Sequence, residues 1–173
     1  MKTTNIEIKA RSSNNDKIKD ILECKGADFR GVHHQIDTYF RVPAGRLKLR
    51  EDGDSMSLIF YERQNQPGPK RSDVLLYESA ADSDLKETLR AALGILTIVD
   101  KRREIYFIEN VKFHLDEVRE LGTFMEIEAI DLDGSIGKDR LLEQCDHYLD
   151  LFKIQRSDLL SGSYGDMLPL TAT

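Results

Sequence analysis

The chain has 173 residues, of which 40% are hydrophobic and 32% are charged, and its formal net charge is −6. This length suits one domain spanning residues 1–173, and the apolar content is high enough for a packed core, which excludes a disordered chain. The acidic balance argues against a protein that binds nucleic acid, because general duplex-binding proteins carry a basic surface.

The predicted elements are mostly strands, recognised by charged residues that alternate with apolar ones, and they are interrupted by helices with apolar residues at helical spacing. The first strand is followed by a helix that Gly26 ends, and the turn Asp52-Gly53-Asp54 joins two strands in a hairpin. Strands are expected at residues 3–11, 46–51, 56–63, 72–78, 96–108, 111–118 and 123–130, and a further strand is expected within residues 29–40, ending in 35–40. Helices are expected at residues 18–25, after the cap-type residues 12–16, and at 82–93 and 135–152, with a short helical segment near 158–160.

Sequential strands with short turns favour an antiparallel sheet over a doubly wound parallel one. Eight such strands, with charged residues on one face and apolar residues on the other, are expected to close into a barrel with a polar interior. The apolar outer face then needs the helices as cover. The predicted fold class is therefore α+β, a closed eight-stranded antiparallel barrel with helices packed outside.

The two cysteines, Cys24 and Cys145, lie far apart in helical segments and have neither metal-ligand nor disulfide spacing. Two reduced thiols are typical of a cytosolic protein. The sequence contains no signal-peptide core and no apolar run of membrane-spanning length. A cytoplasmic protein without a membrane partner is expected.

Acidic residues occupy the charged face of several strands: Glu7, Asp116, Glu126 and Glu128. Glu126 and Glu128 are two residues apart and so point the same way. Clustered carboxylates repel one another unless a cation joins them, and hard divalent cations such as Mg²⁺ or Mn²⁺ prefer oxygen ligands. A solvent-facing sheet of mixed charge explains the alternation equally well. His114 is in phase with Asp116, and the pattern leaves open whether it faces the interior.

Basic residues follow the same phase, at Lys9, Lys48, Arg50, Lys101 and Arg103. Bases two residues apart on separate strands can hold several phosphate oxygens at once. Bases and carboxylates on a shared inward face suit phosphoryl chemistry, in which metal ions and cations neutralise phosphate charge. Ordinary cross-strand ion pairing remains the alternative.

Several motifs resemble those of the CYTH superfamily, the triphosphate tunnel metalloenzymes. Asn5-x-Glu7-x-Lys9 resembles the family's E-x-E-x-K motif, and Leu47-Lys48-Leu49-Arg50 resembles a later strand. The most specific match is the run Leu-Asp-x-Val-x-x-Leu-Gly-x-Phe-x-Glu-Ile-Glu from Leu115 to Glu128. Gln35-x-Asp37-x-Tyr39-Phe40, Lys101-x-Arg103-x-x-Tyr106 and the C-terminal Ser163-Tyr164 complete a resemblance that covers nearly the whole chain.

The resemblance implies a divalent-metal-dependent enzyme (Mg²⁺ or Mn²⁺) that acts on a small-molecule triphosphate. Within the family the chain is most similar to class IV adenylyl cyclases, so the expected reaction is conversion of ATP to cyclic AMP and pyrophosphate. It assigns catalytic roles to Lys9, Arg50 and Asp116. It implies substrate binding by Lys9, Lys48, Arg50, Arg63, Lys101 and Arg103. It implies metal binding by Glu7, Asp73, Asp116, Glu126 and Glu128.

Three positions depart from the family's pattern. Asn5 replaces the first glutamate, Tyr61 stands where a fourth-strand lysine is expected, and Leu75 replaces an in-phase acid after Asp73. Arg63 is the residue expected to substitute for the missing lysine. These losses of charge motivate two alternatives to the cyclase: a triphosphatase acting on thiamine triphosphate or inorganic tripolyphosphate, and a binding protein with little turnover. A homodimer is expected by analogy with the family.

Overall fold

The computed structural model describes residues 2–62, 65–80 and 83–171. Its strands are β1 (Lys2–Arg11), β2 (Asp28–Phe40), β3 (Arg46–Asp52), β4 (Ser55–Glu62), β5 (Lys70–Ala80), β6 (Ile95–Ile108), β7 (Val111–Val118) and β8 (Gly122–Asp131). Its helices are α1 (Asn15–Cys24), α2 (Leu85–Leu93), α3 (Lys138–Leu151), the 3₁₀ turn η1 (Arg156–Asp158) and α4 (Tyr164–Met167).

The strands close into one barrel in the order β1-β5-β4-β3-β2-β6-β7-β8, and every neighbouring pair is antiparallel. Two meanders, β2 to β5 and β6 to β8, are joined through the β2–β6 pair and through β1. The predicted fold class is confirmed. The alternation is compatible with closure, because the inner face of a barrel can carry the charged side chains while its outer face carries the apolar ones.

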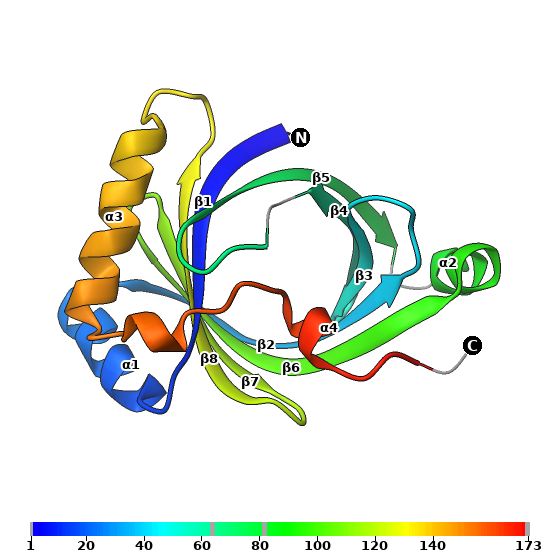
Figure 1. Cartoon of the computed structure of the whole chain (residues 1–173), viewed down its shortest axis with the longest axis horizontal. Helices are drawn as coiled ribbons and strands as arrows, with labels where there is room; N and C mark the ends of the chain where they lie inside the picture. Colours follow the sequence, from blue (N-terminus) through cyan, green and yellow to red (C-terminus); the bar gives the residue numbers. More distant parts are fainter. Residues whose placement is uncertain (1, 63–64, 81–82, 172–173) are drawn as a thin grey trace.

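The helices cover apolar outer faces of the barrel. Figure 1 shows α1 and α3 together on one flank and α2 on the opposite flank. The larger core lies under α1 and α3, where Ile18 and Leu141 pack with outward residues such as Ile8 and Phe113. A smaller core lies under α2, around Leu49 on β3 and its neighbours.

The segment after α3 returns across one end of the barrel, where Figure 1 shows α4 beside the opening. The Leu160 N–H donates to the Lys9 carbonyl at 2.8 Å. The buried Lys70 Nζ donates to the carbonyls of Leu160 and Ser161 at 2.7 and 2.8 Å. A capping box between Ser163 and Asp166 begins α4.

The long C-terminal helix begins later than the sequence predicts, at Lys138 instead of residue 135. The Asp131 carboxylate accepts hydrogen bonds from the N–H groups of Gly134 and Gly137, at 2.8 and 3.1 Å. Gly137 has a φ of 82°, a left-handed conformation that favours glycine. This loop therefore replaces the predicted first helical turn.

The sequence also predicts reduced cysteines and no membrane-spanning segment. Cys24 and Cys145 are free thiols, the first exposed and the second buried. Within the described ranges, no helix combines the length and the apolar character that a bilayer span requires.

Candidate functional site

A cavity of about 330 Å³ lies inside the barrel, lined by inward-pointing side chains from all eight strands and from Ser163 and Tyr164 of the C-terminal segment. Most of the predicted charged residues point into it. The strands contribute to its lining Asn5, Glu7, Lys9, Asp37, Tyr39, Lys48, Arg50, Ile59, Tyr61, Ser72, Val74, Leu76, Lys101, Arg103, Lys112, His114, Glu126 and Glu128. The charged residues of the alternating strands thus line a polar interior, and the alternative of a solvent-facing sheet does not apply to them.

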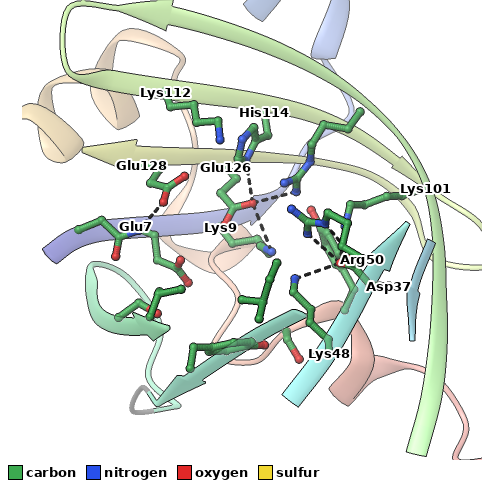
Figure 2. A pocket seen from close by; sticks show the side chains of 18 of the residues that line it. Glu7, Lys9, Asp37, Lys48, Arg50, Lys101, Lys112, His114, Glu126 and Glu128 are labelled. Atoms are coloured by element: carbon green, nitrogen blue, oxygen red, sulfur yellow. Dashed lines mark hydrogen bonds and ion pairs between the residues drawn. The ribbon is translucent and has the colours of Figure 1, made fainter. Parts of the chain in front are cut away.

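Carboxylates gather on one side of the cavity. Glu7 on β1 and Glu128 on β8 are direct partners in the β1–β8 register, and Figure 2 shows both side chains in the same part of the cavity. The Asn5 amide Nδ2 donates a hydrogen bond to Glu128. The buried Asn5 Oδ1 has no hydrogen-bond partner among the described residues. The Asn5 amide oxygen, which lacks a hydrogen-bond donor, therefore lies on the same side of the cavity as two carboxylates.

Glu126 links the acidic side to the basic side. Its Oε2 lies 3.5 Å from Lys9 Nζ, 3.0 Å from Arg103 Nη2 and 3.1 Å from His114 Nδ1. Burial would raise the pKa of Glu126, but Lys9, the His114 hydrogen bond and Arg103 outweigh it and hold this pKa well below its usual value. Glu126 therefore stays charged.

His114 lines the cavity as a neutral side chain. Burial and the nearby Arg103 lower its pKa to about 3. The Glu126 carboxylate can only accept, so the proton of the neutral ring sits on Nδ1. Its Nε2 is then a buried acceptor, without a partner in the part of the chain that the structure describes.

Cations gather on the opposite side around one buried carboxylate, Asp37 (Figure 2). Lys101 Nζ donates to Asp37 at 2.6 Å, Lys48 Nζ at 3.0 Å, and Arg50 binds it bidentately at 2.7 and 2.8 Å. Burial would raise the pKa of Asp37, but Arg50, Lys101 and Lys48 together hold it well below its usual value. One carboxylate thus fixes three cations at the cavity wall.

Burial disfavours the charged forms of Lys48 and Lys101. Burial, together with the nearby Arg50, lowers the pKa of Lys48 to about 8, and it lowers the pKa of Lys101 well below its usual value. Three cations share one carboxylate, so the cluster has an excess of positive charge. An anion entering the cavity would relieve it.

Asp116, for which catalytic and metal-binding roles are predicted, is held by neighbouring side chains. It is fully buried and does not line the cavity. Both of its oxygens bind Arg103, each at 2.6 Å, and Oδ2 also accepts from the Tyr164 hydroxyl at 2.6 Å. With its oxygens occupied, Asp116 positions Arg103 and anchors the C-terminal segment, and its catalytic and metal-binding roles stay predictions.

The predicted inward direction of Asp73 is wrong. The residues of β5 that line the cavity are Ser72, Val74 and Leu76, so Asp73 and Leu75 point outward. Asp73 instead pairs with the exposed Arg71 at 3.1 Å. It cannot bind a metal inside the barrel, and Leu75 removes no charge from the interior. The predicted role of Arg63 falls outside the described residues.

Sequence reasoning left several lining residues out of the site. Asp37 lies in the motif Gln35-x-Asp37-x-Tyr39-Phe40, and its position two residues before Tyr39 is the signal that indicates its direction. Lys112 is two residues before His114 and shares its phase. Tyr164 lies in the C-terminal Ser163-Tyr164 motif, and the centroid of its ring lies 3.9 Å from Lys9 Nζ. Only the fold brings Tyr164 to the cavity, because the sequence around it has no strand alternation that would indicate an inward direction.

The acidic side of the cavity offers oxygen donors to a divalent cation. Among the described residues, no three His, Cys, Asp or Glu side chains come together in a metal-binding arrangement. Two carboxylates and an amide oxygen line the cavity together: Glu7, Glu128 and Asn5, whose Oδ1 has no hydrogen-bond partner among the described residues. Oxygen donors of this kind suit a hard cation such as Mg²⁺ or Mn²⁺, so the residues present fit such an ion.

Comparison with known proteins places the chain. The family model described as the CYTH domain matches residues 3–152. A protein of Methanocaldococcus jannaschii, provisionally named an adenylate cyclase, is 27% identical over 173 residues, covering 92% of this chain and 95% of that protein.

Solved structures share the fold. The PH1012 protein of Pyrococcus horikoshii has a TM-score of 0.80 at 25% identity, covering 95% of this chain and 99% of that one. A protein of Vibrio parahaemolyticus, also provisionally named an adenylate cyclase, has a TM-score of 0.75 at 19% identity, covering 94% of this chain and 96% of that one. By its sequence motifs, its barrel and the family match over residues 3–152, this chain belongs to the CYTH family.

Proposed function

We propose that this protein is a divalent-metal-dependent enzyme that acts on a nucleoside or organic triphosphate inside the barrel. The observation that carries the proposal is the convergence of Lys9, Lys48, Arg50, Lys101 and Arg103 on one cavity that carboxylates also line. A polyanion is the ligand that such a cluster favours, since Lys48, Arg50 and Lys101 share the single carboxylate of Asp37. CYTH enzymes of the triphosphate tunnel type are generally divalent-metal dependent.

The leading reaction is conversion of ATP to cyclic AMP and pyrophosphate. The ribose 3′-oxygen bonds to the α-phosphorus, the bond from that phosphorus to the pyrophosphate oxygen breaks, and the hydroxyl proton is released. The named relatives support this choice, because the relative from M. jannaschii is provisionally named an adenylate cyclase.

The chain's own residues divide the work. Lys9, Lys48 and Arg50 would hold phosphate oxygens and neutralise charge as pyrophosphate leaves. Glu7, Glu128 and Asn5 would hold a divalent cation, which supplies Lewis acidity toward the phosphate oxygens. Arg103, fixed by Asp116, would present its remaining donors to the substrate.

A second candidate, triphosphate binding with little turnover, is favoured by one observation. Asn5 brings no charge to the carboxylate side, and its amide donor occupies Glu128. A cation held by two carboxylates is held less tightly than one held by three.

One assay separates these candidates. Purified protein is incubated with ATP, thiamine triphosphate or tripolyphosphate and Mg²⁺ or Mn²⁺, and cyclic AMP, pyrophosphate and orthophosphate are quantified. We expect cyclic AMP and pyrophosphate in equal amounts from ATP. Orthophosphate as the main product would instead indicate a triphosphatase.

Matched acid variants serve as controls. Glu7→Gln should abolish product formation, whereas Asp73→Asn, which changes an outward acid, should not. Absence of product, with metal-dependent triphosphate binding in calorimetry, would establish the binding candidate in place of the enzyme. Absence of both would refute the whole proposal.

A homodimer, a cytoplasmic location and the lack of nucleic acid or membrane partners stay predictions from the sequence.

A further inference from the structure

The interior of the barrel has two unlike walls. Charged residues line the cavity on β1, β2, β3, β6, β7 and β8. The described parts of β4 and β5 contribute no charged side chain to its lining: they contribute Ile59, Tyr61, Val74, Leu76 and the small polar Ser72. One sector of an otherwise ionic cavity is therefore apolar.

These four apolar residues form a continuous block, here called the β4–β5 wall. Strand pairing places Ile59 directly opposite Leu76, and Tyr61 directly opposite Val74. Pairing of β3 with β4 places Lys48 opposite Ile59. The wall thus begins one strand away from the cations that surround Asp37.

The wall offers apolar surface to whatever enters the cavity. Leu76 is 44% exposed, although it points into the barrel. Ile59 and Val74 pack partly against neighbouring aromatic residues and remain half-buried. Because burying such surface is favourable, and because ligand pockets combine apolar walls with a few placed polar groups, the wall suits an apolar or aromatic part of a ligand.

A phosphate chain does not suit this surface. Phosphate oxygens pressed against aliphatic side chains would lose water without gaining hydrogen bonds. The charged sector therefore fits the phosphates, and the wall fits what they are attached to. Inorganic tripolyphosphate could occupy only the charged sector.

We propose that the β4–β5 wall binds the organic group of the substrate, so that the natural substrate is a triphosphate ester with an apolar or aromatic group, such as a nucleoside triphosphate, and not inorganic tripolyphosphate. This inference rests on the proposed function, since it assumes that triphosphates bind in the cavity. It adds that β4 and β5 determine which triphosphates are selected.

The test compares two neighbouring leucines that face opposite ways. Leu76 points into the cavity, and Leu75, 57% exposed, points outward. Binding of ATP and of tripolyphosphate, each with Mg²⁺, is measured by calorimetry for the wild type, Leu76→Ser, Ile59→Ser and Leu75→Ser. Circular dichroism checks that each variant is folded.

Leu76→Ser and Ile59→Ser should each weaken ATP binding about tenfold while leaving tripolyphosphate affinity unchanged, because the loss of a well-placed apolar contact costs about this much. Leu75→Ser should change neither affinity. Equal weakening of both ligands, or no change in either, would overturn the inference while leaving the proposed function intact. Failure of wild-type protein to bind either ligand would overturn the proposed function itself.

Discussion

Asp37 is the residue on which the cationic side of the cavity depends. It is 1% exposed and binds Lys48, Arg50 and Lys101 simultaneously. A buried charge is tolerable only with partners, and here each partner is also largely buried. The same contacts that stabilise Asp37 hold the three cations ready for an anion.

Asp37→Asn should lower the free energy of unfolding by about 3–5 kcal/mol, because it leaves buried cations without their counter-charge. Urea denaturation followed by circular dichroism measures this change. Saturating tripolyphosphate should recover part of the loss, since an anion that binds the folded state stabilises it. Asp73→Asn, at an exposed ion pair, should cost less than about 1 kcal/mol. Equal stability of the two variants would contradict this account of Asp37.

Lys48 gives triphosphate binding a pH dependence. Its pKa of about 8 in the free protein means that it loses its proton as the pH rises through this value. Triphosphate affinity should therefore fall about tenfold or more between about pH 7 and pH 10, because a charged hydrogen bond is lost. Lys48→Arg should flatten this profile, since arginine stays charged. A wild-type profile as flat as that of the variant would argue against contact between Lys48 and the phosphates.

At the scale of elements, strand phase determines what the sequence can reveal. On β1, β3 and β8 apolar residues separate the inward charged ones, and their inward direction was predicted correctly. On β6 Lys101 and Arg103 also point inward as predicted, although the intervening Arg102 is charged as well. On β5 the acidic Asp73 suggested the wrong phase, because its neighbours Ser72 and Val74 carry no charge. Polarity marks the interior of this barrel on most strands, but Ile59 on β4 and Val74 and Leu76 on β5 are apolar side chains that point inward.

The C-terminal segment completes the site through Tyr164. Tyr164→Phe removes the hydroxyl that donates to the buried Asp116 but keeps the ring beside Lys9. It should lower the free energy of unfolding by about 1–3 kcal/mol, since a buried acceptor loses a partner. Tyr77→Phe, at a 63% exposed position, is the matched control and should be nearly neutral. If both variants unfold at the same urea concentration, Tyr164 does not anchor the segment as described.

At the scale of the whole molecule, barrel closure and most of the charged lining were predictable, because a strict alternation repeats on many strands. The contacts within the lining were not. Glu126 lies among Lys9, Arg103 and His114, while Asp116 is fully occupied by Arg103 and Tyr164. Which carboxylate neutralises a base and which remains available depends on registers between strands far apart in sequence. That information arises only when the barrel closes.

The central claim is that the barrel interior binds a triphosphate with a divalent cation. The most direct test is a crystal structure of the protein with a slowly reacting ATP analogue and Mn²⁺, whose anomalous signal locates the metal. The account predicts phosphates in contact with Lys9, Lys48 and Arg50, Mn²⁺ beside Glu7 and Glu128, and the nucleoside against β4 and β5. An analogue bound outside the barrel, or phosphates that touch none of these cations, would contradict it.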